Sequence, residues 1–541
     1  MKKKYVSSIL TAFVVVAVLA IAITVAATGV TTSATLWAML PPLVAIGLAL
    51  ITKEVYSSLF FGIVVGAILA CGGNAATAVD HVISDGLIAA ISGTAGIFLF
   101  LVILGTIVAL VNKSGASAAF GRWAATHIKS RVGAQLSAFV LGIMIFIDDY
   151  FNCLTVGSVM KPVTDAHKVS RAKFSYIIDA TAAPICMIAP ISSWAAAVTS
   201  YTEGTAIEGK GFEYFIRAIP YNFYSLLTIV FVVAMIFIKA DFGPMRRHEM
   251  NALLKGDLFS TDERVETTQA ESNPRGRVID LVLPIIVLVA VSVVGLIYIG
   301  GFFTAGSAKG NFIDAFAGTD ATVGLPWGAL IALIFVIGYM LVRRLITFKG
   351  AMECVPLGFK AMVPAITILT LATALKNISN GLLNASGYVD TLMKSEAAQN
   401  MASFLPAVIF LIACLLAFAT GTSWGTFGIL IPIVCTMFKV NDPMLVICMS
   451  ASLAGAVCGD HCSPISDTTI MSSAGAECVH VNHVSTQLPY AITVAAISLI
   501  CYIVAGFVQN AYICLALGVV LIIGFLLAVR IFYKKKEQTA A

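Results

Sequence analysis

The chain has 541 residues, of which 59% are hydrophobic and 11% charged, and its mean hydropathy is +0.96. Soluble domains carry roughly 25% charged residues, so this composition excludes a soluble globular protein. The formal net charge of +5 is modest, and the cations lie mostly between apolar segments, so the charge bears on membrane orientation rather than on nucleic-acid binding.

The first apolar segment, Leu10 to Ala27, follows three lysines at positions 2 to 4. This N-terminus resembles a signal peptide, but the run is long and many further runs follow, so we expect an uncleaved first membrane helix. A helix needs ~20 residues to cross the hydrocarbon core. Four more runs approach or reach that length: Phe98 to Val111, Phe223 to Ile238, Leu281 to Ile299 and Ile513 to Val529. The twelve cysteines lie mostly inside apolar runs and indicate no disulfide framework.

The segment Val132 to Met160 has basic residues before and after it. Since positive flanks favour the cytoplasmic side, a single crossing cannot satisfy both ends. A re-entrant hairpin can, with one leg from Val132 to Ile147, a tip at residues 148–152 and a return leg to Met160. Irregular backbone is tolerated at membrane depth where protein or a watery cavity surrounds it. The tip carries Asp148, Asp149 and Asn152.

The next segment, Phe174 to Ser200, predicts a broken helix, because Pro184 and Pro190 each remove a helical hydrogen bond. Asp179 precedes the break, and Ser192 and Ser193 follow it. The polar stretch from Lys239 to Arg277 carries charges of both signs and is predicted to be a cytoplasmic linker. The expected organisation is therefore a first transmembrane half at residues 1–238, a linker at 239–277 and a second half at 278–541.

In the second half, Met401 to Phe438 contains no charged side chain and predicts another hairpin with its tip at residues 420–426. The tip carries Thr420, Thr422, Ser423 and Thr426. A second broken helix is expected at Gly459 and Pro464. It carries Asp460, Ser463, Ser466, Asp467 and Thr468.

Three collinear matches relate the two halves. Leu110-Val-Asn-Lys-Ser-Gly115 matches Leu382-Leu-Asn-Ala-Ser-Gly387, Pro162 matches Pro432, and Pro190-Ile-Ser-Ser193 matches Pro464-Ile-Ser-Asp467, at offsets of 272, 270 and 274 residues. The first hairpin has basic flanks and the second has neutral ones, which predicts opposite orientations. We therefore expect an all-α polytopic membrane protein of about 12 spans. It would contain two inverted-topology repeats, each with a re-entrant hairpin and a broken transmembrane helix, and both basic termini in the cytoplasm.

Charged groups at membrane depth are the main functional candidates, because an ionised side chain at the bilayer centre costs at least ~2.5 to 3.5 kcal/mol. Carboxylate, hydroxyl and carbonyl oxygens are the ligands of hard cations, and the broken helices supply all three. If two adjacent carboxylates faced one cavity, desolvation and repulsion would let one keep a proton near neutral pH and exchange it for a cation. The expected cation- or proton-binding residues are Asp148, Asp149, Asn152, Asp179, Asp460, Ser463, Ser466, Asp467 and Thr468, and the expected substrate-pathway residues are Ser192, Ser193, Thr420, Thr422, Ser423 and Thr426.

Several of these residues have a structural alternative. Asp179 would equally serve to bond a neighbouring hydroxyl or cap a helix, and residues 420–426 would also serve as a flexible break. Lys376 is the one cation expected at membrane depth, where it either snorkels to an interface or pairs with a buried Asp. Trp194 and Trp424 lie beside the predicted breaks and are the aromatic residues considered for substrate stacking.

The histidines are expected to be structural. His461 with Cys458 and Cys462 resembles a metal cluster, but no distant partner has the required spacing. We therefore expect no metal beyond transported Na+ and no other cofactor. His480 and His483 are expected in a cytoplasmic loop, solvated rather than functional, with a pH-sensing role as the alternative.

At four motifs the chain resembles the NhaC-type Na+/H+ antiporter family of the ion transporter superfamily, over roughly residues 90 to 510. The motifs are Phe146-Ile-Asp-Asp-Tyr-Phe-Asn152, Ile178-Asp-Ala-Thr-Ala-Ala-Pro184, Gly459-Asp-His-Cys-Ser-Pro-Ile-Ser-Asp-Thr-Thr-Ile470 and Gln487-Leu-Pro-Tyr490. The resemblance implies Na+/H+ exchange across a bacterial plasma membrane, with Asp148, Asp149 and Asn152 at the first tip and Asp460, Ser463, Ser466 and Asp467 in the second broken helix. By analogy with the wider superfamily, a homodimer is also to be considered.

The leading hypothesis is therefore an Na+/H+ antiporter that works by alternating access, with buried Asp residues binding Na+ or H+ competitively. Its expected partners are the lipid bilayer, Na+ and H+. The alternative is an Na+- or H+-coupled transporter or exchanger of an amino acid or small carboxylate, held by hydroxyls and helix N-termini with the help of Lys376. A channel is a third reading. An enzyme is not expected, because the chain lacks a nucleophile elbow, a His-Glu-x-x-His motif and a phosphate loop.

Overall fold

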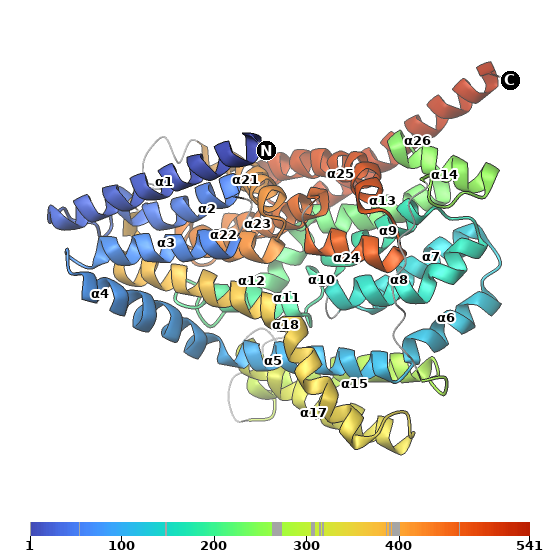
Figure 1. The fold of residues 1–541 in the computed structure, drawn as a ribbon, viewed down its shortest axis with the longest axis horizontal. Helices are drawn as coiled ribbons and strands as arrows, with labels where there is room; N and C mark the ends of the chain where they lie inside the picture. The colour runs from blue at the N-terminus through green and yellow to red at the C-terminus, as the bar shows by residue number, and fades with distance from the viewer. Residues whose placement is uncertain are drawn as a thin grey trace.

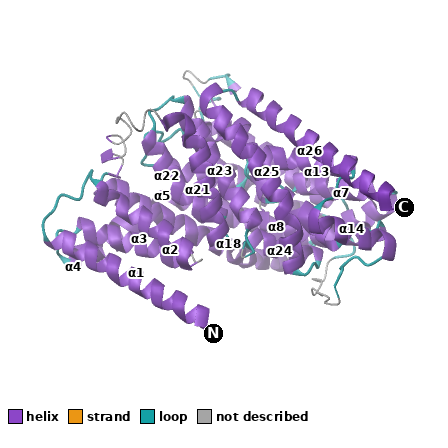
Figure 2. Ribbon diagram, turned by 90° about the horizontal axis from the view of Figure 1, so that it is seen from above, coloured by secondary structure: helices purple, strands orange, loops and turns teal. Residues whose placement is uncertain are grey.

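The structure, a computed structural model, describes residues 2–540 apart from residues 53–54, 147–148, 262–272, 305–308, 313–314, 316–318, 386, 389–390, 392–400 and 465. Throughout these residues the regular structure is helical and no strand occurs (Figure 2). Before residue 240 the helices are α1 (Lys2–Ala27), η1 (Leu36–Met39), α2 (Leu40–Thr52), α3 (Val55–Ala70), α4 (Ala75–Asp80), η2 (His81–Ile88), α5 (Ala89–Lys113), α6 (Ala116–His127), α7 (Arg131–Met144), α8 (Asp149–Ala166), α9 (Arg171–Thr181), α10 (Ala183–Cys186), α11 (Ser193–Thr202), α12 (Gly211–Ala218), η3 (Ile219–Tyr221) and α13 (Phe223–Ile238).

After residue 240 the helices are α14 (Gly243–Lys255), α15 (Ile279–Ile299), α17 (Ala321–Val342), α18 (Phe348–Lys376), η4 (Asn377–Leu382), η5 (Ala402–Phe404), α21 (Leu405–Thr420), α22 (Ser423–Met437), α23 (Pro443–Cys462), α24 (Asp467–Ala476), α25 (His480–Val508) and α26 (Ala511–Ala540). In the described residues, six helices are long and apolar enough to cross a membrane, or eight if each of two bent pairs is one span. Helices α7, α21 and α22 are apolar but shorter, as membrane helices interrupted by a break would be. The protein is thus an all-helical, polytopic membrane protein.

The first predicted hairpin has its turn slightly earlier than expected. Helix α7 ends at Met144 and α8 begins at Asp149, so Asp149 and Asn152 lie in the first turn of α8 rather than at the tip. An acidic residue in the first turn is favourable because it faces the positive end of the helix dipole. The return leg also continues to Ala166 instead of ending at Met160, with Pro162 inside the helix.

The second hairpin is shifted in the same way. Helix α21 continues to Thr420, where Gly421 takes the left-handed conformation (φ 68°) that ends a helix, and the Thr422 side chain accepts a hydrogen bond from the backbone N–H of Gly425. The turn is therefore Gly421 and Thr422, and Ser423 to Thr426 form the first turn of α22 rather than part of the tip.

Both predicted broken helices are interrupted. The first divides into α9, the short α10 that starts at Ala183 beside Pro184, and α11, which Ser192 caps through the N–H of Ala195. The second divides into α23 and α24, and Ser466 caps α24 through the N–H of Thr469. Gly459, expected to break the second helix, instead lies inside α23, where a Cβ would come within 2.2 Å of the Cys414 carbonyl oxygen on α21. This glycine therefore allows close helix packing.

The interrupted segments meet in the middle of the molecule (Figure 1). Helices α7 and α8 lie in the right half of this view, α21, α22 and α23 lie in the left half, and α10 and α11 lie between them. Helix α24 packs against α8 and α9, and α11 packs against α22. The breaks of one part of the chain are thus placed beside the hairpin of the other.

The linker contributes a structural helix. Helix α14 packs against α9 and α25, and its buried Glu249 accepts a hydrogen bond of 2.9 Å from the N–H of Ser170, which caps α9. Burial raises the pKa of Glu249, against the lowering effects of Lys173 and Arg131. Among the described residues, five ion pairs connect the elements at this end of the molecule: Arg131 with Glu249, Lys173 with Asp241, Arg171 with Asp165, Arg171 with Glu477 and Lys161 with Glu477.

Candidate functional site

The Asp179 carboxylate is the centre of a buried polar cluster. Its Oδ2 atom accepts hydrogen bonds from Thr469 Oγ1 (3.1 Å), His483 Nε2 (3.2 Å) and Gln487 Nε2 (2.8 Å). Asp179 is 1% exposed, and the donors come from α24 and α25, about 300 residues further along the chain. Three donors on one oxygen stabilise the ionised form of a carboxylate, so this aspartate does more than bond one neighbouring hydroxyl.

A second histidine completes the cluster. His461 Nε2, on α23, lies 3.8 Å from Asp179 Oδ2, and its Nδ1 atom is 2.8 Å from the hydroxyl of Tyr224 on α13. The Tyr176 ring stacks on the imidazole, with centroids 6.0 Å apart and an interplanar angle of 8°. Gln487 Nε2 also donates to the His461 carbonyl. Five helices therefore place two imidazoles beside one carboxylate.

The Asp179 carboxylate is buried, and two imidazoles lie within 4 Å of one of its oxygens. A buried negative charge requires a compensating positive charge, which either a proton or a cation can supply.

The expectation that His480 and His483 lie in a solvated loop is wrong. Both belong to α25, and His483 is fully buried against Asp179. His480 is the first residue of the helix and contacts Ser473 Oγ (3.0 Å) and the Pro464 carbonyl (2.7 Å). Polar residues at positions 483, 487 and 490 recur every three to four residues, so they share one face of an otherwise apolar helix. That spacing was the available signal for His483, and Gln487 and Thr469 lie in two of the four motifs described above. Nothing in the sequence pointed to Tyr224.

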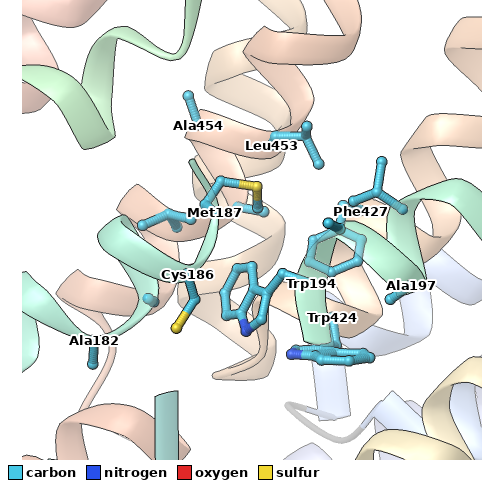
Figure 3. Close-up of a cluster of buried hydrophobic side chains, with 14 of the residues drawn as sticks. Ala182, Cys186, Met187, Trp194, Ala197, Trp424, Phe427, Leu453 and Ala454 are labelled. Atoms are coloured by element: carbon cyan, nitrogen blue, oxygen red, sulfur yellow. The ribbon is translucent and has the colours of Figure 1, made fainter. Parts of the chain in front are cut away.

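The hairpin turns form a second buried group, and Figure 3 shows its aromatic side chains Trp194, Trp424 and Phe427 within a cluster of buried hydrophobic residues. Asp149 Oδ1 accepts a hydrogen bond of 3.3 Å from Trp194 Nε1 at the start of α11. The Trp194 ring lies against Trp424 (centroids 6.1 Å apart) and Phe427 (5.6 Å) on α22. Beside Trp424, Ser423 Oγ donates to Asp460 Oδ2 on α23 (2.9 Å). Aromatic rings therefore separate two buried carboxylates, one from each interrupted region.

Several predicted site residues have structural roles in this conformation. Asn152 Nδ2 lies within 3.1 Å of the carbonyl oxygens of Gly142, Ile145 and Thr181, so it ties the first hairpin to the end of α9. Ser463 Oγ donates to the Phe418 carbonyl (2.8 Å). Three further hydroxyls make local contacts, in which Ser192 caps α11, Ser466 contacts Thr468 and Thr426 donates to the Thr422 carbonyl.

Other predicted residues lie apart from these groups or outside the description. Ser193 is fully buried, and within the described part of the chain its hydroxyl has no hydrogen-bond partner. Lys376 donates a hydrogen bond to the carbonyl of Glu203, and within the described residues it is not paired with a buried aspartate. Asp148 lies outside the described residues, as do the side chains of Thr420 and Asp467.

Buried oxygen atoms remain for a cation in the Asp179 cluster and beside it. In the described part of the structure, Asp179 Oδ1, Gln487 Oε1 and Asn152 Oδ1 are buried and have no hydrogen-bond partner. Oxygen acceptors of this kind fit a hard cation such as Na+. No group of three or more His, Cys, Asp and Glu side chains that could hold a metal ion is found in the same residues.

Comparison with known proteins gives a consistent result. The sequence profile of the Na+/H+ antiporter family matches residues 185–507. A Haemophilus influenzae protein of uncharacterised function is 38% identical over 92% of this chain and 96% of its own length. The malate-2H+/Na+-lactate antiporter of Bacillus subtilis is 28% identical over 34% of this chain and 38% of its own length.

Two more distant similarities complete the comparison. The arginine/ornithine antiporter ArcD of Halobacterium salinarum is 35% identical over 19% of this chain and 22% of its own. Among solved structures, the YdaH transporter of Alcanivorax borkumensis aligns over 80% of this chain and 89% of its own, with 14% identity and a TM-score of 0.48.

Proposed function

Because this chain belongs to the Na+/H+ antiporter family, we propose that it is a secondary active transporter that exchanges Na+ for H+ by alternating access. The observation that carries this proposal is the buried Asp179 carboxylate with two imidazoles beside it. Two of the relatives described above are antiporters. The bacterial plasma membrane is the proposed location, with both basic termini in the cytoplasm.

The proposed exchange follows from the buried charge of Asp179. When the proton that balances this charge leaves the cluster, the carboxylate is left without a counter-charge at a position that is 1% exposed. Na+ then replaces the proton, bound by oxygen atoms that include Asp179 Oδ1 and Gln487 Oε1. Binding of a new proton expels the cation, because both cannot be accommodated at a single negative charge. The two ions therefore compete for one site, as antiport requires.

The carboxylates Asp149 and Asp460 extend the proposed cation path to the two hairpin turns. Each is at most 3% exposed and accepts a hydrogen bond from its own half of the chain, Asp149 from Trp194 and Asp460 from Ser423. A buried carboxylate attracts a cation strongly because little water screens its charge. We assign the path to these residues together with the hydroxyls of Ser193 and Ser423.

Inverted repeats are part of the proposal and are supported by reciprocal packing. Helix α24 packs on α8, and α11 packs on α22, so each second half-helix contacts the other hairpin. Both contacts are close. A Cβ at Gly157 would meet the backbone of Gly475 at 2.4 Å, and one at Gly428 would meet the Tyr201 ring at 2.9 Å. Gly157 and Gly428 are 271 residues apart, and Tyr201 and Gly475 are 274 apart, close to the offsets of the sequence repeat.

The proposed topology has about 12 crossings, with transmembrane halves at 1–238 and 278–541 and the 239–277 linker in the cytoplasm. The α14 end of the molecule then faces the cytoplasm, and we propose that the five ion pairs described above hold this end closed. Alternating access requires these pairs to separate in the inward-facing state.

Transport by everted membrane vesicles provides the direct test. Addition of Na+ should collapse an acid-inside pH gradient in vesicles that contain the wild-type protein. Asp149→Asn and Asp460→Asn should each reduce the initial rate at least tenfold, because each removes a buried negative charge from the path. Glu353→Gln, on the exposed end of α18, should retain the wild-type rate. Wild-type rates in both aspartate variants would reject the proposed path.

The Trp194 hydrogen bond gives a more specific expectation. Trp194→Phe keeps an aromatic ring against Phe427 but removes the N–H that Asp149 accepts. A hydrogen bond to a charged group contributes about 1.5 to 3 kcal/mol, so the half-saturating Na+ concentration should change about tenfold in a vesicle assay. Trp424→Phe is the matched control, because Trp424 Nε1 has no partner among the described residues. An equal change in both variants would show that ring size, and not the hydrogen bond, is responsible.

A further inference from the structure

The last part of α26 lies where a membrane helix leaves the hydrocarbon core. The 19 residues from Ala511 to Val529 carry no charge, and at 1.5 Å per residue they span ~28 Å, close to the ~30 Å thickness of that core. Arg530 is then the first charged residue, Lys534 follows one turn later, and Lys535 and Lys536 come next in the sequence. The side chains of Arg530 and Lys534 are exposed. This end of α26 therefore carries its cations at the depth of the lipid headgroups.

Helix α14 brings further cations to the same level. The guanidinium carbon of Arg246 lies 4.4 Å from the centroid of the Tyr533 ring on α26. Figure 1 and Figure 2 both show α14 and the C-terminal end of α26 at the same end of the molecule. Arg247, the next residue of α14, is exposed. The two helices together form one basic surface, here called the α14–α26 surface, which consists of Arg246, Arg247, Arg530 and Lys534.

Acidic side chains do little to neutralise the α14–α26 surface. Glu249, the acidic residue of α14, is buried and paired with Arg131. Of the ion pairs that the described residues form, none includes Arg247 or the two cations of α26. From Arg530 onward the sequence has one acidic residue, Glu537, against four cations. The surface is therefore basic and attracts anions.

Exposed apolar side chains border these cations. Ile531 and Phe532 lie between Arg530 and Lys534 on α26 and are 67% and 64% exposed. A soluble anion would leave both side chains uncovered. A phospholipid would cover them with its acyl chains while its phosphate contacts the cations, because the two kinds of side chain lie at the boundary between hydrocarbon and headgroups. The combination favours a lipid over free phosphate.

We infer that the α14–α26 surface binds an anionic phospholipid, with the headgroup phosphate on Arg247, Arg530 and Lys534 and the acyl chains against Ile531 and Phe532. Clusters of about four to eight Lys and Arg residues directly outside a membrane helix bind anionic lipids in this way. The surface lies apart from the carboxylates assigned to cation exchange. This partner goes beyond Na+/H+ exchange and does not depend on it.

The bound lipid would hold α14 in place. Phe242, the residue before α14, packs on Phe525 of α26 (ring centroids 5.3 Å apart) and on Tyr490 of α25 (4.6 Å). Glu249 of α14 accepts a hydrogen bond from the N–H of Ser170, which caps α9. A lipid that bridges α14 and α26 therefore strengthens an existing contact. It should stabilise the folded protein, as any ligand of the native state does.

Binding to the purified full-length protein in detergent micelles tests the surface. The probes are dioctanoyl phosphatidylglycerol, which is anionic, dioctanoyl phosphatidylcholine, which has the same chains and no net charge, and glycerol 3-phosphate, which has no chains. By native mass spectrometry the wild type should bind phosphatidylglycerol at least tenfold more tightly than either other probe. Phosphatidylglycerol should also raise the melting temperature. The triple variant Arg247→Gln, Arg530→Gln and Lys534→Gln should bind phosphatidylglycerol at least tenfold more weakly and lose this stabilisation.

A second triple variant is the control. Lys129→Gln, Lys168→Gln and Lys349→Gln remove the same charge from three exposed positions outside the surface, and this variant should bind phosphatidylglycerol as the wild type does. Equal binding of the two lipids by the wild type, an equal loss in both triple variants, or equally tight binding of glycerol 3-phosphate would overturn the proposal.

Single variants cover the case in which the first triple variant does not fold. Arg247→Gln and Lys534→Gln should then each weaken binding of phosphatidylglycerol about threefold, and no loss in either would equally overturn the proposal. The readouts are lipid binding and melting temperature, so they give their answer whether or not the protein exchanges Na+ for H+. Failure of the lipid site and failure of the proposed exchange are thereby distinguished.

Discussion

Replacement of Asp179 by asparagine is expected to reduce Na+-driven proton movement about 100-fold. The carboxylate accepts from Thr469, His483 and Gln487 through one oxygen, and an asparagine amide would remove the negative charge while placing its own donors among them. Removing one partner of a buried charged group costs about 3 to 5 kcal/mol, and each 1.36 kcal/mol on a barrier is a factor of ten in rate. Stopped-flow measurement of internal pH in proteoliposomes after addition of Na+ would give the rate.

The control for this variant is Asp280→Asn. Asp280 is also a fully buried carboxylate, but it bonds Tyr339 (2.5 Å) and Arg343 (2.9 Å) at α15 and α17, outside the proposed site. It should lower thermal stability and leave the exchange rate per folded molecule near that of the wild type. Comparable exchange by Asp179→Asn and Asp280→Asn would remove Asp179 from the mechanism.

The positions of the helix breaks could be predicted because their causes are local. Pro184 and Pro190 cannot continue a helix, and Ser192 and Ser466 have side chains that cap the helix after each break. The hairpin turns were predicted a few residues too late. The polar character of Asp149 and Ser423 suggested a tip, whereas in the structure these residues begin the return helix.

The composition of the Asp179 cluster could not be predicted in the same way. His483 and Gln487 are 304 and 308 residues from Asp179, and no local pattern connects positions so far apart. His483 was predicted to lie in a loop, because the sequence alone does not show that α25 packs against α9 and α13. The number of spans differs as well. The sequence predicted about 12, whereas six to eight helices in the described residues are long and apolar enough to cross a membrane, because the interrupted helices are individually short.

Replacement of Gly157 by alanine is expected to be strongly destabilising, because Gly157 makes one of the two close contacts of the reciprocal packing. The added Cβ would lie 2.4 Å from the Gly475 backbone, and no side-chain movement relieves a contact with backbone. Helix α8 must then move away from α24, and overpacking of this kind costs about 1 to 3 kcal/mol or more. We expect a lower melting temperature of the purified protein by intrinsic fluorescence. The exchange rate should also fall, because Thr469, which donates a hydrogen bond to Asp179, lies in α24.

Two further glycines separate this explanation from a general intolerance of substitution. Gly338→Ala, at a position with no atom within 4 Å of the new Cβ, should be neutral or stabilise by up to about 1 kcal/mol through helix propensity. Gly428→Ala should weaken exchange as Gly157→Ala does, but with a smaller loss of stability, because its new Cβ meets Ala372 and the Tyr201 ring at 2.9 Å, whereas the Cβ at position 157 meets the Gly475 backbone at 2.4 Å. If Gly428→Ala left exchange unchanged while Gly157→Ala abolished it, the two contacts would not be functionally equivalent, and the inverted-repeat relation between the hairpins would lose its main support.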